Sequence, residues 1–155
     1  MSTVTRIGAD IPRSTPSLVL AVIAHDRKKE DLLRLVRSHR PQLDGLRLVA
    51  TRATGLVLQQ EIDVDIELVD SGPEGGDLQI GARVVEQQVD ALIFLRDPST
   101  AHPHEPDIQA LLKVCDIHGI PVATNLASAE IVLHFLADHI RRVRETRALH
   151  PAGGV

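Results

Sequence analysis

An α/β fold, with a five-stranded, mainly parallel sheet and helices on both faces, is predicted by two features of this sequence. Short apolar runs recur along the chain without the polar alternation of a sheet that has one solvated face. Between them stand longer segments with apolar residues at helical spacing, and this alternation is typical of parallel sheets. At 155 residues the chain has the size of one domain. The predicted strands are residues 17–24, 47–51, 65–69, 90–95 and 121–124.

The segments between these strands predict five helices. The first carries Glu30 and Asp31 in its first turn, where a carboxylate interacts favourably with the helix dipole. The fourth places Ile108 and other apolar residues at helical spacing, and it ends at Gly119, a residue type that often terminates helices. The predicted helices are residues 28–40, 55–61, 77–88, 106–118 and 128–139.

Two segments flank this alternating pattern. Residues 1–16 hold Gly8, Pro12 and Pro16 without periodicity and predict a flexible N-terminal arm. Residues 141–155 carry four arginines against one glutamate and predict a basic C-terminal tail. The tail is either the solvated end of a helix or a subunit contact or allosteric phosphate site. The prediction is therefore a single domain over residues 17–140, between an arm and a tail.

Composition excludes several classes of protein. Trp and Tyr are absent and Phe occurs twice, so the chain lacks aromatic surfaces for stacking single-stranded bases. The net charge of −4 also disfavours general nucleic-acid binding, but it does not exclude a small anionic substrate. No apolar run reaches the roughly 18 residues of a membrane helix. The single cysteine, Cys115, and the lack of a signal-peptide pattern predict a cytoplasmic protein without nucleic-acid or membrane partners.

Polar residues follow every predicted strand. In a parallel sheet all strand-to-helix loops meet at one edge, and ligands bind beyond the carboxyl ends of the strands. The densest cluster is residues 97–107, D-P-S-T-A-H-P-H-E-P-D, which holds groups able to donate, accept and move protons. The other clusters are residues 25–29, 51–55, 71–77 and 124–125.

Each cluster also has a purely structural interpretation. The Gly-rich loop 71–77 forms either a tight turn with Asp77 as a helix N-cap, or an anion cradle built from backbone N–H groups. Thr51 and Thr54 either cap a helix or donate hydroxyl groups to a phosphate. Lys28 and Lys29 are either solvated residues at a helix start, or one of them is a point charge for an anion.

The histidines raise the alternative of a metal site. His102 and His104, with Asp97 and Asp107, offer ligand atoms on one loop. Zinc needs three or four ligands in fixed geometry, and no H-x-x-x-H or C-x-x-C spacing supports such a set. His25, at the end of a strand, is either a hydrogen-bonded structural residue or part of a site. No metal is therefore predicted.

Four segments together resemble the methylglyoxal synthase family. They read A-H-D-x-K-K at 24–29, S-G-P-x-G-G-D-x-Q-I-G-A at 71–82, D-P-x-x-A-x-P-H-x-P-D at 97–107 and I-P-V-A-T-N at 120–125. The resemblance implies a single Rossmann-like domain, a homohexamer, and conversion of dihydroxyacetone phosphate (glycerone phosphate) to methylglyoxal and inorganic phosphate. It implies no cofactor, and it gives inorganic phosphate the roles of product and allosteric inhibitor.

The resemblance also implies the residues near the chemistry. By position, Asp77 matches the family's base, His104 its catalytic histidine, and Asp107 the carboxylate beside it. His25 and Asp97 match other polar groups of that site. These types suit the reaction, because a base must reach a C–H proton while a donor meets charge on the ketone oxygen. A neutral His104 can be that donor and then move protons, with Asp107 fixing its tautomer.

A phosphate-binding set is implied as well, with one departure. The family's loop after the second strand reads T-G-T-T-G, where this chain has Arg52 and Ala53 in the second and third positions. Ala53 removes a hydroxyl donor, and Arg52 either narrows the pocket or supplies a new phosphate contact. The implied phosphate ligands are Lys29, Thr51, Thr54, Ser71 and Gly72, with Arg52 as a further candidate.

Two other functions compete with this one. The same fold occurs as a non-catalytic anion-binding regulatory module, but such modules are fused to enzymes and need not keep the Asp-His-Asp set. A phosphoacceptor signalling domain would place a Lys after the fifth strand, where this chain has Thr124 and Asn125. The residues therefore favour a lyase of the methylglyoxal synthase type over both alternatives.

Overall fold

The computed structural model describes residues 17–149 and contains one five-stranded sheet in which all neighbouring strands are parallel. The predicted arm, residues 1–16, and the last six residues of the predicted tail, 150–155, lie outside the described residues. All five predicted strands are present, in the spatial order β3-β2-β1-β4-β5. They are β1 (Val19–Ala24), β2 (Arg47–Thr51), β3 (Ile66–Val69), β4 (Ala91–Leu95) and β5 (Val122–Ala123).

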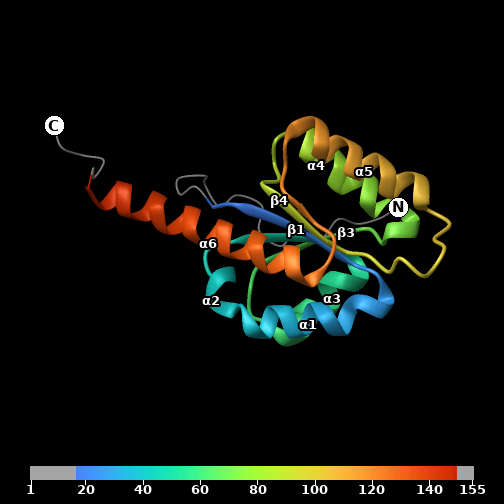
Figure 1. Ribbon diagram of the computed structural model, residues 1–155, viewed down its shortest axis with the longest axis horizontal. Helices are drawn as coiled ribbons and strands as arrows, with labels where there is room; N and C mark the ends of the chain where they lie inside the picture. The colour runs from blue at the N-terminus through green and yellow to red at the C-terminus, as the bar shows by residue number, and fades with distance from the viewer. Residues whose placement is uncertain (1–16, 150–155) are drawn as a thin grey trace.

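Helices cover both faces of the sheet (Figure 1). The α-helices are α1 (Lys29–Ser38), α2 (Arg40–Leu43), α3 (Arg52–Glu61), α4 (Gly76–Val85), α5 (Glu105–His118) and α6 (Leu126–Leu149), with 3-10 turns η1 (Asp26–Lys28) and η2 (Gly72–Glu74).

The two faces of the sheet belong to separate hydrophobic clusters. Leu20 and Val22 of β1 pack with the cluster under α1, α2, α3 and α6. Ala21 and Ile23 of the same strand pack with the cluster under α4 and α5. Because successive side chains of a strand point to opposite faces, a strand buried on both sides must be apolar at every position, as β1 is.

The predicted first helix is divided into two. Residues 28–40 were expected to be continuous, but α1 ends at Ser38 and α2 starts at Arg40, with His39 between them. Pro41 stands at the start of α2, where a missing N–H is tolerated; in a continuous helix it could not donate to the Arg37 carbonyl and its ring would clash there. Proline therefore explains the break.

The last helix is longer than predicted. Residues 128–139 were expected to be helical, whereas α6 runs from Leu126 to Leu149 and takes in the first part of the predicted basic tail. Its start is capped by Asn125, whose side chain accepts the Ser128 N–H at 3.0 Å. Beyond residue 139, Arg141 pairs with Asp138 and Glu145 at helical spacing, which supports the extension. No helix within residues 17–149 is long and apolar enough to cross a membrane.

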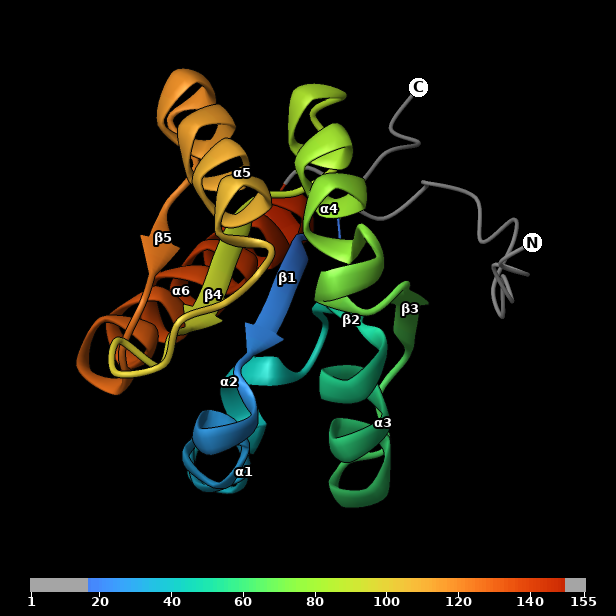
Figure 2. The same cartoon turned by 90° about the vertical axis from the view of Figure 1, so that its right-hand side faces the viewer.

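The order of the strands fixes where a ligand site is expected. The chain builds β1, β2 and β3 in one direction and then crosses to the other side of β1 to form β4 and β5. The carboxyl ends of β1 and β4 consequently lie side by side, as Figure 2 shows. In open α/β sheets such a reversal point is where ligands bind.

Candidate active site

The Gly-rich loop after β3 places Asp77 in the first turn of α4. The 3-10 turn η2 leads into Gly75, whose φ of +100° suits glycine. At Gly76 a Cβ atom would lie 1.9 Å from the carbonyl oxygen of Asp70, so a side chain is excluded there. The residue at the N-cap position is Gly75, and no side-chain cap bond forms. The interpretation of Asp77 as an N-cap is therefore wrong.

Asp77 is a buried carboxylate without hydrogen bonds. The residue is 0% exposed, and neither Oδ1 nor Oδ2 has a partner among the described residues. His104 is the neighbour in reach, with Nε2 3.6 Å from Asp77 Oδ2. Burial raises the pKa of Asp77, the nearby Asp107 charge adds to this, and His104 opposes it. A carboxylate stripped of partners in this way is a stronger base than a solvated one.

His25 is held in one orientation at the end of β1. Its Nδ1 accepts the backbone N–H of Asp97 at 2.8 Å, and its own backbone N–H donates to Leu95 at 3.1 Å. The edge of its ring meets Phe94, with centroids 5.2 Å apart. Because Nδ1 is an acceptor, the proton of the neutral ring resides on Nε2, a buried atom with no partner among residues 17–149.

His25 remains neutral because of its surroundings. Burial lowers its pKa to about 4, and the neighbouring His102, His104 and Arg96 act in the same direction, while Asp97 opposes them. Protonation of His25 would also put a hydrogen on Nδ1, where it would face the backbone N–H of Asp97. The site thus contains a fixed N–H donor that keeps its protonation state across the physiological range.

The pKa of His25 makes the stability of the fold depend on pH. Between pH 6.5 and about pH 4, His25 is protonated in the unfolded chain but neutral in the folded chain. The free energy of unfolding therefore falls as pH drops through this window. His25→Asn keeps an acceptor for the Asp97 amide but does not titrate. Urea unfolding at pH 7 and pH 4.5 should show the unmodified chain losing up to about 3 kcal/mol more than the variant. Equal losses in both proteins would contradict a buried neutral His25.

The 97–107 loop supplies two more imidazoles. His104 stands at the N-cap position of α5, and its ring centroid is 6.4 Å from that of His25. His102 stacks on His25, with centroids 3.8 Å apart and planes at 26°. The buried atoms His102 Nε2 and His104 Nδ1 have no hydrogen-bond partner among the described residues. Three imidazoles therefore form one cluster, and His104 links it to Asp77.

The two aspartates of this loop make contacts away from the His104 ring. Asp107 was expected to fix its tautomer, but His104 Nδ1 has no partner within residues 17–149. Asp107 lies in the first turn of α5, where its backbone N–H donates to the His104 carbonyl at 3.0 Å. Asp97 contacts His25 through its backbone, while its carboxylate accepts the Ser99 N–H and the Thr100 hydroxyl. These bonds, the Thr100 hydroxyl first, lower the pKa of Asp97.

The three imidazoles meet the spacing of a metal site but not its chemistry. One ligand atom from each of His25, His102 and His104 lies within 4.8 Å of the other two. The sequence-based set with Asp97 and Asp107 is therefore not the one that the fold assembles. A histidine that binds metal through one nitrogen normally donates the other N–H to an acceptor. His25 Nδ1 faces a donor instead, which opposes ligation through Nε2.

The threonines after β2 are bonded within the protein. The Thr54 hydroxyl accepts the Ala24 N–H at 3.1 Å and donates to the Ala24 carbonyl at 3.3 Å. The Thr51 hydroxyl donates to the Thr54 hydroxyl at 3.2 Å. Thr54 therefore ties the end of β1 to the start of α3. Lys29 donates to the Ala24 carbonyl at 3.0 Å and to Asp26 at 2.8 Å, so its charge is held beside the same strand end.

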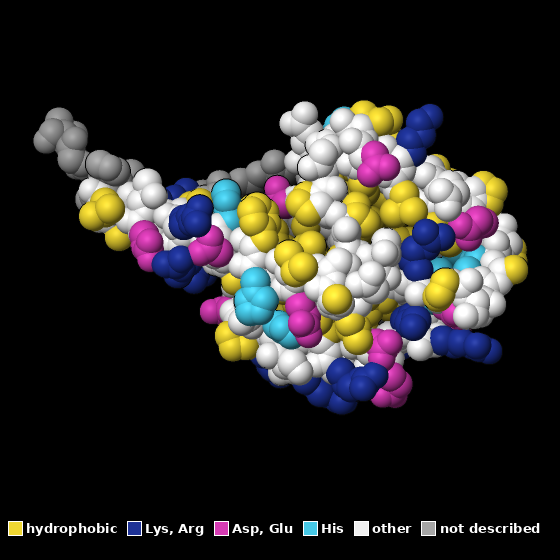
Figure 3. All heavy atoms as spheres, viewed as in Figure 1, with side chains coloured by type: hydrophobic (Ala, Val, Ile, Leu, Met, Phe, Trp, Pro, Cys, Tyr) yellow, Lys and Arg dark blue, Asp and Glu magenta, His cyan; other side chains and the backbone are white. Residues whose placement is uncertain are grey.

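The loop after β3 also closes over the base. A Cβ atom at Gly72 would lie 3.1 Å from His104 Nε2 and 3.4 Å from both carboxylate oxygens of Asp77. Ser71 uses its carbonyl to accept the Glu74 and Gly76 N–H groups, which shapes the turn. Arg52 is exposed at the first position of α3. Figure 3 shows Lys and Arg side chains gathered around histidines at the right-hand end of the molecule, where the strands end.

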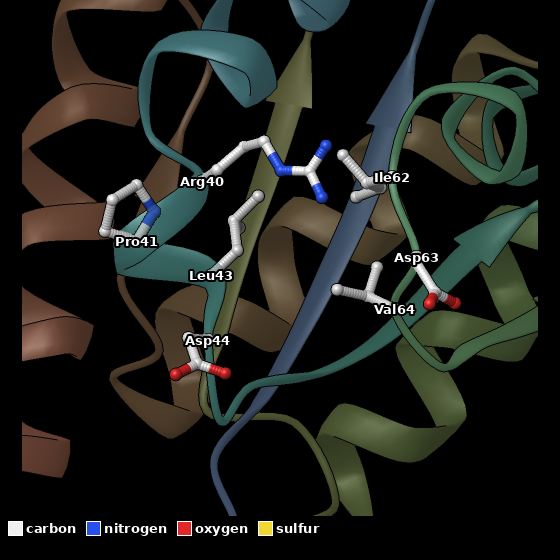
Figure 4. A pocket seen from close by; sticks show the side chains of 7 residues that line it. All are labelled: Arg40, Pro41, Leu43, Asp44, Ile62, Asp63 and Val64. Carbon is white, nitrogen blue, oxygen red and sulfur yellow. The ribbon is translucent and has the colours of Figure 1, made fainter.

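A separate pocket lies at the other edge of the sheet. It has a volume of about 350 Å³ and sits between α2 and the loop that leads into β3 (Figure 4). Arg40 extends across it toward Ile62, and the Arg40 guanidinium donates to the Glu61 carbonyl at 3.2 Å. Its lining contains no histidine, so it is not part of the candidate site.

Sequence reasoning missed one member of the cluster. His102 occupies an unspecified position of the D-P-x-x-A-x-P-H-x-P-D segment, so the resemblance implies no role for it. Its only signal was proximity to His104, and stacking on a residue 77 positions earlier cannot be read from spacing.

Comparisons with known proteins identify the family of the chain. A family model described as the MGS-like domain matches residues 31–124. Methylglyoxal synthase of Moorella thermoacetica is 50% identical over 120 residues, covering 77% of this chain and 94% of that protein. The enzyme of Ralstonia nicotianae is 53% identical over 114 residues, covering 74% of this chain and 84% of that protein.

The fold agrees as well. The crystal structure of methylglyoxal synthase from Elizabethkingia anophelis superposes with a TM-score of 0.70 at 38% identity, covering 76% of this chain and 77% of that one. The segment matched by the family model, residues 31–124, contains Asp77 and His104. The chain belongs to the methylglyoxal synthase family of lyases.

Proposed function

We propose that the chain converts dihydroxyacetone phosphate to methylglyoxal and inorganic phosphate through an enediolate. The observation that supports this most is Asp77, a fully buried carboxylate without hydrogen bonds that lies 3.6 Å from an imidazole nitrogen. Such a group is suited to taking a proton from carbon, a step that solvated carboxylates perform poorly.

In the first step Asp77 removes a proton from the hydroxymethyl carbon of the substrate. The electron pair moves into a C–C double bond, and negative charge develops on the ketone oxygen. His104 and the fixed Nε2–H of His25 are the donors that meet this charge. Because both lie in a water-poor site, their effect on the transition state exceeds that of the same groups in water.

In the second step the enediolate expels phosphate. The C–O bond to phosphate breaks and its electron pair leaves with phosphate, a double bond forms to the methylene carbon, and the hydroxyl-bearing carbon becomes an aldehyde as its O–H proton passes through His104 to the departing phosphate. The product enolate then takes the proton held by Asp77 on its methylene carbon, which gives methylglyoxal and restores the Asp77 carboxylate. The C–O bond must stand out of the enediolate plane for its orbital to overlap the π system, so phosphate must be held in one orientation.

The groups proposed to hold phosphate lie around the end of β1. Lys29 supplies a fixed charge, the Thr51 hydroxyl can rotate toward the ligand, and Thr54 maintains the strand end that positions both. Ser71 and the Gly72 backbone close the loop next to Asp77. Asp97 orients His25, and Asp107 strengthens Asp77 as a base through its charge.

Arg52 is proposed as a phosphate ligand in place of the hydroxyl that Ala53 lacks. Arg52→Ala and Arg52→Gly should raise KM about tenfold and leave kcat nearly unchanged, as expected for loss of a charged hydrogen bond to substrate. The control is Lys113→Ala, which removes a positive charge from the exposed side of α5. A lower KM in the Arg52 variants would identify Arg52 as an obstruction instead.

The function is tested by incubating the purified chain with dihydroxyacetone phosphate. Methylglyoxal, measured by a colorimetric assay, and inorganic phosphate should appear in equal amounts, and dialysis against a chelator should not change the rate. Binding of phosphate without any product would favour the regulatory-module alternative, which requires anion binding but no base.

A further inference from the structure

We propose that His102 is a positioning residue, whose ring holds His25 in the plane that aims its Nε2–H at the substrate oxygen. This inference rests on the proposed function, because it assigns His25 a donor role. It goes beyond that function, since the segment that identifies His104 leaves position 102 unspecified.

The His25 ring is restrained on three sides. The Asp97 amide fixes Nδ1, the edge contact with Phe94 restrains one flank, and His102 covers a face. The hydrogen bond from the Asp97 amide, by itself, would allow the His25 ring to rotate about the direction of that hydrogen bond. A face-stacked ring 3.8 Å away removes this freedom, since tilting would drive the two rings together.

His102 also has a place in the electrostatics of the site. The charged or titratable groups that face His25 are His104 and His102 on the loop, Arg96 and Asp97 after β4, and Asp26 after β1. After burial, His102 has the largest influence in lowering the pKa of His25. Positive charge on the neighbouring side chains opposes a proton on His25, so the cluster favours the neutral donor.

Two substitutions separate stacking from charge. His102→Phe keeps a flat ring over His25 but cannot titrate, whereas His102→Gln removes both. We expect His102→Phe to keep kcat at pH 7.5 within about twofold, and His102→Gln to lower it about tenfold with KM little changed. In both variants the acid limb of kcat/KM should move to higher pH. The control is His118→Gln, an exposed residue at the end of α5.

A second measurement does not depend on turnover. Nitrogen-15 NMR of the imidazoles reports the tautomer of His25, which should be the single Nε2–H form in the unmodified chain and in His102→Phe. In His102→Gln the signals should broaden or indicate both tautomers. If His102→Gln matches the unmodified chain in kcat, pH profile and His25 tautomer, the proposal is wrong. Equal impairment of both variants would also overturn it, because stacking would then not matter. An unmodified chain that is inactive but has an ordered His25 would refute the proposed function and not the role of His102.

Discussion

Asp77→Asn is expected to lower kcat for methylglyoxal formation at least about 10³-fold, because the amide cannot accept the carbon proton. The substrate should still bind, since the phosphate-holding groups around Lys29 are unchanged. Proton exchange at the hydroxymethyl carbon, followed in deuterium oxide by NMR, should stop together with product formation. Near-normal hydrogen–deuterium exchange at this carbon in the variant would contradict the assignment of Asp77 as the base.

The same substitution should stabilise the fold. Within residues 17–149 Asp77 makes no hydrogen bonds that the amide would lose, and its pKa is raised by burial. Folding therefore favours the protonated form, so stability falls as pH rises through the window from 3.8 to the raised value and stays lower above it. At pH 7 the variant should melt a few degrees higher. Asp116→Asn, on the exposed side of α5, should change neither turnover nor Tm.

Gly72→Ala is expected to lower kcat/KM about 10²-fold without unfolding the chain. The added methyl group would lie 3.1 Å from His104 Nε2 and 3.4 Å from both oxygens of Asp77, where the substrate carbon must approach. Backbone strain is not the cause, because the φ of Gly72 is not positive. The loss should be measured by steady-state kinetics, beside a melting curve that shows an intact fold.

A matched control is available in the helix that carries the base. At Gly81 of α4 a Cβ atom would lie 3.7 Å from the nearest side chain, an ordinary contact. Gly81→Ala should therefore leave turnover unchanged and should, if anything, stabilise the helix. If Gly72→Ala turns over as fast as Gly81→Ala, the substrate does not approach Asp77 past Gly72.

Much of the fold was predictable because its signals are local. Apolar runs such as residues 91–95 mark buried strands, and Gly119 ends α5 in the left-handed conformation as expected. The break at His39 and the length of α6 were not predicted. The first depends on how Pro41 is accommodated, and the second on ion pairs along the exposed C-terminal part of α6, which apolar periodicity does not report.

The sequence predicted which loops would meet at the site but not the contacts between their side chains. The loops that meet at the end of β1 follow from a parallel sheet, so Asp77, His25 and His104 were expected together. Sequence could not show that Asp97 reaches His25 through its backbone, because the partner of a backbone N–H depends on three-dimensional placement. For the same reason, the prediction that Asp107 fixes the tautomer of His104 was wrong, and the stacking of His102 on His25 was not predicted.

The bond between the Asp97 amide and His25 joins positions 72 residues apart in the chain. Loops of this length close late and slowly, since their entropy is lost before the contact forms. His25 cannot acquire its tautomer until β4 has docked beside β1. In a refolding experiment, recovery of turnover should therefore lag behind recovery of the circular dichroism signal of the helices. The time course of enzymatic activity would then report when β4 docks beside β1.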